Sequence, residues 1–207
     1  MSSVEIIKLS ELTVYLMEIN ENQLPEYFND LTAAEKTRLE SIHHPAKRHE
    51  FLASRSLRTQ LFGLNHIHYT EVGAPYIENE GFISISHTTN LVGIACSSAF
   101  RVGVDLEFIK DKAVKLSPRF VNDSEKQLFD VSDPCDMSLL WSFKETLFKL
   151  AGRKGILWAK DLIVGKNEHG YTGTILGDGP GRQYQLAVSN FQHYLVTCNT
   201  TDATLIY

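Results

Sequence analysis

The stretch Val102-Gly103-Val104-Asp105-Leu106-Glu107-Phe108 alternates between apolar residues and small or acidic ones. Successive side chains of a strand point to opposite faces, so we expect Gly103, Asp105 and Glu107 on one face and the apolar residues on the other. The two carboxylates then stand about 7 Å apart along the backbone and repel each other unless a cation or solvent relieves them. The stretch predicts a strand with one solvated face or a site for a hard cation such as Mg²⁺.

The segment from Ser138 to Ala151 carries the strongest helical pattern in the chain. Its apolar stripe, at helical spacing, consists of Leu140, Phe143, Leu147 and Leu150. Trp141, Glu145 and Lys149 form a second stripe nearly opposite the first. An exposed Glu–Lys pair would explain two of them, but a fully solvated face rarely carries tryptophan. The second stripe therefore predicts the wall of a half-buried cleft.

Other patterns around these two segments predict an α+β fold with antiparallel sheets, because helices and strands do not alternate strictly. The expected strands are 4–19 (one or two), 82–86, 91–96, 184–188 and 194–198. The expected helices are 33–42, 46–64 and, shorter, 122–129. Thr32 and Glu35 form a capping box before the first helix, Gly63 ends the second, and 177–181 reads as a loop. The order of strand, helices and strands recurs loosely, which suggests two halves.

Composition bounds the class of protein. The chain has 207 residues, of which 43% are hydrophobic and 22% charged, as in ordinary globular proteins. We found no apolar run long enough for a membrane span and no signal peptide, so we expect a cytoplasmic protein without a membrane partner. Three dispersed cysteines predict neither a disulfide framework nor a zinc site with the nearby histidines.

Charge is unevenly distributed along the chain. The net charge is −5, yet residues 36–58 contain six basic residues and two acidic ones, a net of +4. This segment can be the solvated face of a helix or an anion site, and the acidic remainder argues against a nucleic-acid partner.

Ser86 and His87 stand where a strand ends, and they can bind a phosphate or cap the turn. No G-x-S-x-G elbow accompanies them, so a serine hydrolase is not indicated. Together, Ile85-Ser86-His87, Gly103–Glu107 and Trp141-Ser142-x-Lys144-Glu145-x-x-x-Lys149 resemble the signature of the 4'-phosphopantetheinyl transferases. The spacing of Asp105 and Glu145 is similar to that in the family. Phe120-Val-x-x-x-Glu125 resembles the segment that the family has between its second and third motifs. The resemblance covers roughly residues 30 to 155.

The resemblance implies transfer of the 4'-phosphopantetheine group of coenzyme A to a serine hydroxyl of an apo carrier protein (acyl, polyketide or peptidyl). The length is similar to that of the longer, surfactin-synthetase-activating type. Similarity to this longer type implies a monomer of two similar halves, related by a pseudo-twofold axis, with the site between them. Residues 1–100 would be the coenzyme A nucleotide side, and 101–207 the metal and catalytic side.

The resemblance also implies roles for single residues. Asp105, Glu107 and Glu145 would bind Mg²⁺, with Mn²⁺ as a substitute. Glu145 would be the base, with Lys149 and Asp105 as further catalytic residues. The coenzyme A site would comprise Arg38, Lys36, Arg55, Ser86, His87, Lys144 and Lys149. Lys110, Lys112, Lys115 and Arg119 give a local charge of +3 with Asp111, so this segment is either an ordinary solvated loop or the docking site of an acidic carrier protein.

One position departs from the family pattern, because Ala74 stands between Gly73 and Pro75 where the family commonly has lysine. This removes one expected phosphate contact. A non-catalytic coenzyme A or carrier-protein binder on the same fold is an alternative, although it would not need intact Asp105, Glu107 and Glu145. A different Mg²⁺-dependent phosphoryl or nucleotidyl transferase is another, but no Walker loop or G-x-G-x-x-G opens a helix.

Overall fold

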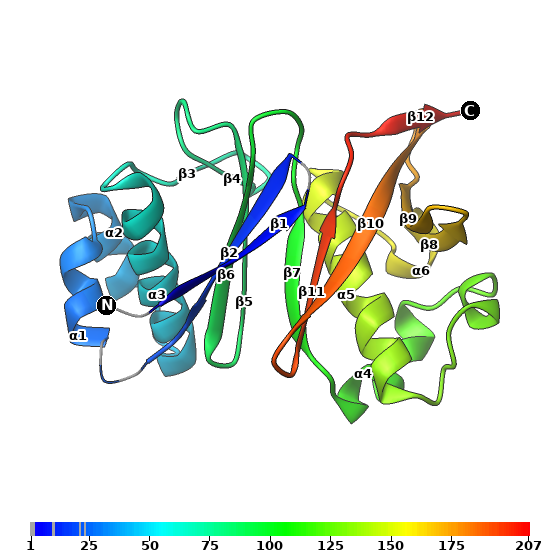
Figure 1. Cartoon of the computed structure of the whole chain (residues 1–207), viewed down its shortest axis with the longest axis horizontal. Helices are drawn as coiled ribbons and strands as arrows, with labels where there is room; N and C mark the ends of the chain where they lie inside the picture. The colour runs from blue at the N-terminus through cyan, green and yellow to red at the C-terminus, as the bar shows by residue number, and fades with distance from the viewer. Residues whose placement is uncertain (1–2, 10, 21, 23) are drawn as a thin grey trace.

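The structure is a computed structural model that describes residues 3–9, 11–20, 22 and 24–207. It is an α+β fold with two antiparallel sheets of six strands each, which confirms the predicted fold class. Figure 1 shows the two sheets next to each other, with α1, α2 and α3 on one flank and α5 packed against the second sheet.

The first half contains one sheet and a helical layer. Its strands, in spatial order, are β1 (Val4–Leu9), β2 (Leu12–Glu18), β6 (Leu91–Ser97), β5 (Phe82–Thr88), β4 (Pro75–Tyr76) and β3 (His68–Tyr69). Its helices are α1 (Leu24–Tyr27), the 3₁₀ turn Phe28–Asp30, α2 (Ala33–Glu40) and α3 (Pro45–Phe62). The capping box at Thr32 and the end of α3 at Gly63 are confirmed.

The second half follows the same plan. Its strands, in spatial order, are β7 (Val104–Phe108), β11 (Tyr194–Asn199), β10 (Gly181–Phe191), β9 (Gly170–Ile175) and β8 (Leu162–Asn167), and β12 (Thr204–Ile206) pairs with β10. Its helices are α4 (Asp111–Leu116), α5 (Pro134–Ala151) and α6 (Trp158–Asp161), with 3₁₀ turns at Ser117–Arg119 and Glu125–Gln127.

The two halves share one topology. Five strands of each half, without β1 and β12, have the orders β2-β6-β5-β4-β3 and β7-β11-β10-β9-β8; both orders place the earliest of the five beside the latest and then continue back through the chain strand by strand. The helices are inserted after β2 in the first half and after β7 in the second, and the long helix, α3 or α5, packs on the sheet. The two halves therefore resemble each other in strand order, although their sequences show no repeat.

Three local predictions need correction. The segment expected as a basic loop is the helix α4 followed by a 3₁₀ turn, and the expected helix 122–129 contains only the 3₁₀ turn Glu125–Gln127. Helix α5 begins at Pro134, before the apolar stripe, because the Asp133 side chain accepts from the Cys135 and Asp136 backbone N–H groups. Proline at the first helical position and aspartate at the N-cap are a recognisable start signal.

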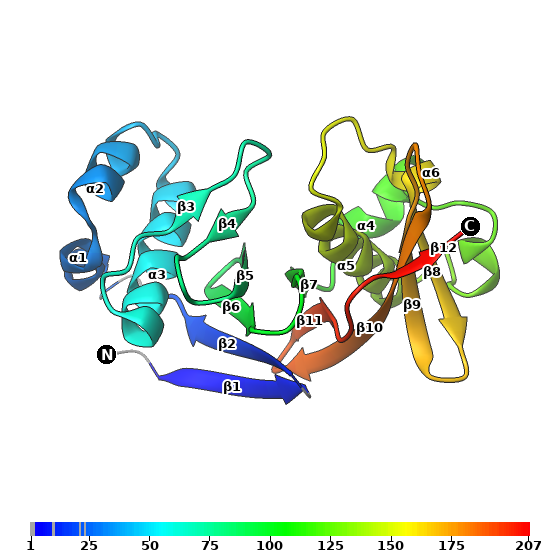
Figure 2. The ribbon, with the colours of Figure 1, turned by 90° about the horizontal axis from the view of Figure 1, so that it is seen from above.

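The halves meet along β5 and β7, which lie side by side in Figure 2. Strand β7 is the edge of its sheet, so its outward N–H groups need partners. The Ser84 hydroxyl accepts from Val104 N and the Ser86 hydroxyl from Leu106 N, each at 3.1 Å. Two serine hydroxyls of the first sheet thus accept hydrogen bonds from backbone N–H groups at the edge of the second sheet, and these bonds hold the two halves together.

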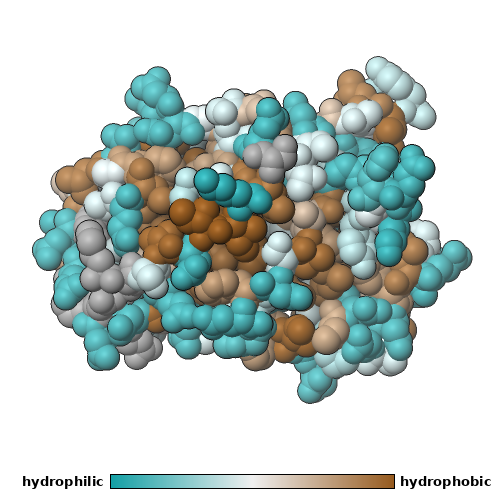
Figure 3. Space-filling view, in the orientation of Figure 1, coloured by the Kyte–Doolittle hydropathy of each residue, from teal (hydrophilic) through white to brown (hydrophobic). Residues whose placement is uncertain are grey.

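Figure 3 shows an apolar area in the middle of the molecular surface. In the same orientation, Figure 1 places strands β1 and β2 at this area. Ile6 of the edge strand β1 is 53% exposed. Among the described residues, no helix combines the length and the apolarity that a bilayer crossing requires.

Candidate active site

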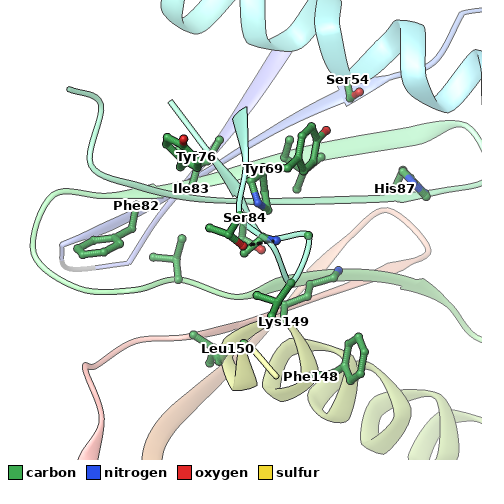
Figure 4. Close-up of a pocket in the computed structure, with 18 of the residues that line it drawn as sticks. Ser54, Tyr69, Tyr76, Phe82, Ile83, Ser84, His87, Phe148, Lys149 and Leu150 are labelled. Carbon is green, nitrogen blue, oxygen red and sulfur yellow. Dashed lines mark hydrogen bonds between the residues drawn. The ribbon is translucent and has the colours of Figure 1, made fainter. Parts of the chain in front are cut away.

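A cleft of about 870 Å³ lies between the two halves. One wall comes from α2, α3 and the segment 69–87, and the other from the C-terminal end of α5. Figure 4 shows Phe148, Lys149 and Leu150 of α5 facing the strand residues Phe82, Ile83 and Ser84. The cleft therefore joins residues that lie more than sixty positions apart in the chain.

The described residues that line the cleft include six cations and a single carboxylate. The cations are Arg38, Lys47, Arg55, Arg101, Lys149 and Arg153, and the carboxylate is Glu50. Aromatic rings share the walls, among them Phe51, Tyr69 and Phe148. Such a lining suits a ligand with several phosphates and a flat ring.

Only part of the basic segment 36–58 serves this cleft. Arg38 lines it, with its guanidinium carbon 4.5 Å from the centre of the Tyr69 ring. Lys36 lies instead over the Phe28 ring and does not line the cleft. Arg48 donates to the carbonyl oxygens of Leu39 and Ile42, at the end of α2. Part of the local positive charge is thus structural.

Arg55 has both a structural and a cleft-lining position. Its Nε lies 3.1 Å from Glu35 Oε1, and Arg58 Nη2 lies 3.0 Å from Glu35 Oε2, with all three side chains buried. The remaining Nη2 of Arg55 donates to the Tyr69 hydroxyl at 2.7 Å. Burial raises the pKa of Glu35, but the Thr32 N–H and the two arginines outweigh burial and lower the pKa below its ordinary value.

His87 lines the cleft as well, with Nδ1 3.3 Å from Glu50 Oε2. Burial lowers the pKa of His87, and the adjacent Glu50 carboxylate opposes that effect. Ser86 is placed differently, because it does not line the cleft. Its hydroxyl donates to Asp105 Oδ1 and accepts from Leu106 N and Lys149 Nζ, which uses its one proton and both lone pairs.

Asp105 is buried behind the α5 wall and does not itself line the cleft. Its Oδ1 accepts from Ser86 and from Lys149 Nζ, and its Oδ2 accepts from the Ser142 hydroxyl at 2.9 Å. Lys149 connects this carboxylate to the cleft, since it lines the cleft and lies 3.0 Å from Asp105 Oδ1. The expected alternation holds, because Val104 and Leu106 point into an apolar cluster away from α5.

Glu107 and Glu145 complete an acidic group around Asp105. Burial and the Asp105 charge raise the pKa of Glu145 to about 7; Lys149 opposes this and Glu107 adds to it. Glu107 pairs with Lys110 at 2.8 Å. Among the described residues, no three Asp, Glu, His or Cys side chains form a ready metal-binding group as they are placed. The donors nevertheless fit Mg²⁺ in kind, since three mutually repelling carboxylates are hard oxygen ligands that a cation would draw together.

The second stripe of α5 is half-buried, as predicted. Trp141, Glu145 and Lys149 are all partly exposed, and Trp141 stacks on Trp158 with ring centres 4.7 Å apart. Of the three, only Lys149 lines the main cleft, and Trp141 lines a separate, smaller hollow of about 230 Å³ with Glu107, Phe108 and residues of α4. The apolar stripe from Leu140 to Leu150 is buried, which confirms the predicted core face.

Lys144 requires a correction. Its side chain has no exposed surface, and Nζ lies 2.8 Å from Glu125 Oε2 and donates to the carbonyl oxygens of Phe120 and Trp158. Burial lowers the pKa of Lys144, while the Glu125 pair opposes that effect. Because the ammonium is enclosed and fully bonded on the core side of α5, it has no access to the cleft.

Lys47, Arg101 and Arg153 were not predicted as site residues. Lys47 belongs to the basic segment, but the other two are single arginines, one before β7 and one after α5, with no motif around them. Only the approach of the two halves brings them into one cleft.

The site thus consists of a cationic cleft, suited to a ligand with several phosphates, and a neighbouring group of three carboxylates, between halves that share a strand order. Residues 101–199 match the model of the 4'-phosphopantetheinyl transferase superfamily. The matched range contains Asp105, Glu107, Glu145 and Lys149, and it supports this superfamily, and hence a transferase, for the second half of the chain. No curated protein matches the chain.

Proposed function

We propose that the protein transfers the 4'-phosphopantetheine group of coenzyme A to a serine hydroxyl of an apo carrier protein, in a Mg²⁺-dependent reaction. The observation that carries the proposal is Lys149, which lines the cationic cleft and touches Asp105 in the carboxylate group. The match of residues 101–199 supports the same chemistry at the level of the superfamily.

Coenzyme A would lie in the cleft with its nucleotide toward the first half. Arg38 and Lys47 provide cations for its phosphates, His87 provides a polar contact, and the Tyr69 and Phe51 rings provide apolar surface for the base. Arg55 reaches this wall while it pairs with Glu35. Ser86 and Lys144 were both expected to contact coenzyme A. Their hydrogen bonds indicate other roles: Ser86 holds Asp105, and Lys144 pairs with Glu125 in the core.

Asp105, Glu107 and Glu145 would hold the divalent ion. Bound there, Mg²⁺ would neutralise charge on the pyrophosphate and polarise the phosphorus that is attacked. Glu145, which is partly exposed beside Asp105 and Glu107, would also act as the general base and take the proton of the carrier serine. The serine oxygen forms a bond to the phosphorus of phosphopantetheine, the bond from that phosphorus to the bridging oxygen breaks, and 3',5'-ADP leaves. Lys149 would stabilise the negative charge on the departing group.

The repeated strand order supports the longer, two-half type, which implies a monomer with residues 1–100 on the nucleotide side and 101–207 on the catalytic side. We propose a cytoplasmic location, where coenzyme A and carrier proteins would meet the enzyme.

The carrier protein would dock on α4 and the turn after it. Lys112, Lys115 and Arg119 are exposed there, and the small hollow lined by Phe108, Leu116 and Trp141 adjoins them. An acidic carrier would meet positive charge beside the carboxylate group rather than the acidic remainder of the surface.

The test incubates the protein with coenzyme A, Mg²⁺ and an apo carrier protein, and measures the mass of the carrier. We expect a gain equal to phosphopantetheine that requires the divalent ion and releases 3',5'-ADP. Omission of Mg²⁺ with a chelator, and a carrier whose serine is replaced by alanine, are the controls. Tight coenzyme A binding with no carrier modification would favour a binding protein and refute the transferase.

A further inference from the structure

Three hydroxyl groups form a buried chain that ends on Asp105. Ser142 Oγ lies 2.9 Å from Asp105 Oδ2 and 2.8 Å from Thr197 Oγ1, and Thr197 Oγ1 lies 2.9 Å from Thr146 Oγ1. None of the three residues has exposed surface. The chain thus runs from the interior of the second half to the buried carboxylate that Lys149 connects to the cleft.

The position of each hydroxyl follows from secondary structure. Thr197 of β11 is the direct cross-strand partner of Asp105 of β7, so both side chains lie on the face that α5 covers. Ser142 and Thr146 are one turn apart on α5 and point to the same side of that helix. The chain therefore bridges all three elements that surround Asp105.

The direction of the hydrogen bonds can be assigned. A hydroxyl has one proton, and the bond to an ionised carboxylate is the strongest use of it, so Ser142 donates to Asp105. Thr197 is then the donor toward Ser142 and Thr146 the donor toward Thr197, and each shares its single proton between the hydroxyl and the backbone carbonyl of that neighbour. The carbonyl oxygens of Ser142 and Thr197 also lie within reach of these donors, at 3.0 and 3.2 Å.

Packing alone does not account for this chain. Apart from polar contacts such as that of Lys149 with β7, α5 packs on its sheet through apolar side chains such as Leu140, Phe143 and Leu147. Burying a hydroxyl costs free energy unless the hydroxyl is hydrogen-bonded. Three buried hydroxyls therefore do not make the fold more stable than apolar side chains of the same size would. Their shared feature is that they lead to one oxygen of Asp105.

We propose that the Thr146–Thr197–Ser142 chain is a positioning device that fixes the Asp105 carboxylate in the orientation needed to bind the divalent ion. Ser142 restrains Oδ2, and Thr197 and Thr146 keep the Ser142 proton directed at that oxygen. The inference rests on the proposed function, because it assigns Asp105 as a metal ligand. Ser142, Thr146 and Thr197 are positioning residues and touch neither substrate nor ion.

The test compares two substitutions at one position. Thr197→Val keeps the shape and removes the hydroxyl, whereas Thr197→Ser keeps the hydroxyl and removes a methyl group. Free Mn²⁺ is measured by electron paramagnetic resonance during titration of the protein, alone and with coenzyme A, and the melting temperature is measured in parallel. Loss of a group behind a metal ligand lowers affinity by about 10- to 100-fold, which is the loss expected for Thr197→Val. Thr197→Ser should keep the wild-type Mn²⁺ affinity even though it also lowers the melting temperature.

A second readout separates positioning from damage to the fold. For Thr197→Val, the Mg²⁺ concentration that gives half-maximal activity should rise in parallel with the loss of Mn²⁺ affinity, while kcat at saturating Mg²⁺ recovers. If Thr197→Val does not fold, the pair Thr146→Val and Thr146→Ser at the outer end of the chain repeats the comparison. Equal loss in the valine and serine variants, or loss in neither, would overturn the inference alone. Wild-type protein that binds no Mn²⁺ would overturn the proposed function as well.

Discussion

The Lys149 ammonium lies 3.0 Å from Asp105 Oδ1 and 2.6 Å from the Val104 carbonyl oxygen. This contact crosses from α5 to β7 and places one cation at the boundary between the cationic cleft and the carboxylate group. Burial and repulsion raise the pKa of Glu145, and Lys149 is the cation that opposes both. Lys149 therefore moderates the charge of the carboxylates and presents positive charge to the ligand.

Loss of a carboxylate should abolish most of the activity. Asp105→Ala or Glu145→Gln should lower turnover at least about 10²-fold, because each removes a proposed metal anchor or the proposed base. The rate of carrier modification at saturating coenzyme A and Mg²⁺ is the measurement. Glu40→Gln, on the exposed side of α2, is the control. A near wild-type rate in either variant would show that the metal-site assignment is wrong.

Coenzyme A affinity should depend on Arg38 and on the residue at position 74. Arg38→Ala should weaken binding, and Ala74→Lys should strengthen it by about 1 kcal/mol through an added charge-assisted hydrogen bond, since both residues line the cleft. Calorimetric titration with coenzyme A and with its 3'-dephospho form is the measurement. Equal affinities for the two ligands would remove the role of the 3'-phosphate.

Charge reversal on α4 should impair use of the carrier protein. Lys112→Glu with Lys115→Glu should raise KM for an acidic carrier and leave coenzyme A affinity unchanged, because both lysines are exposed outside the cleft. The effect should shrink above physiological salt, where the Debye length falls below about 8 Å. Lys126→Glu with Lys166→Glu changes the net charge equally elsewhere on the second half and should leave KM unchanged. A low-salt KM that is the same in both double variants would place docking on another surface.

Glu35 should make folding stability depend on acid pH. Its pKa is lowered in the folded protein, so its stabilisation is complete above the ordinary value of 4.5 and is lost as pH falls toward the lowered pKa. Glu35→Gln leaves Arg55 and Arg58 buried without their counterion and should cost about 3–5 kcal/mol at neutral pH. Denaturant unfolding between pH 3 and 7 measures both effects. The variant should show a flatter decline below pH 4.5 than wild type, and an equally steep decline would contradict the assignment.

Lys144 should matter for stability and not for the ligand. Lys144→Met leaves Glu125 buried without its cation and should lower the free energy of unfolding by about 3–5 kcal/mol. Coenzyme A affinity, measured by calorimetry well below the melting temperature, should stay at the wild-type value. Lys149→Met, the matched change in the cleft, should instead weaken coenzyme A binding. A clear loss of coenzyme A affinity in Lys144→Met would show that Lys144 does contribute to the ligand site.

The sequence alone determined the features that depend on local periodicity. Alternation placed Asp105 on the face of β7 opposite Val104 and Leu106, and helical spacing separated the buried stripe of α5 from the Trp141 stripe. The capping box at Thr32 was readable for the same reason, since its partners are three residues apart. These features follow from backbone geometry, which is the same wherever the segment lies in the fold.

Only the tertiary structure decided which partner each polar side chain has. Lys144 and Lys149 lie on one helix and look alike in sequence, yet one is enclosed with Glu125 and the other reaches Asp105 and the cleft. Arg101 and Arg153 likewise join the cleft only because the two halves pack along β5 and β7. Whether a charge binds a ligand or stabilises the core depends on distances between segments remote in sequence, and these distances are set by packing and not by residue spacing.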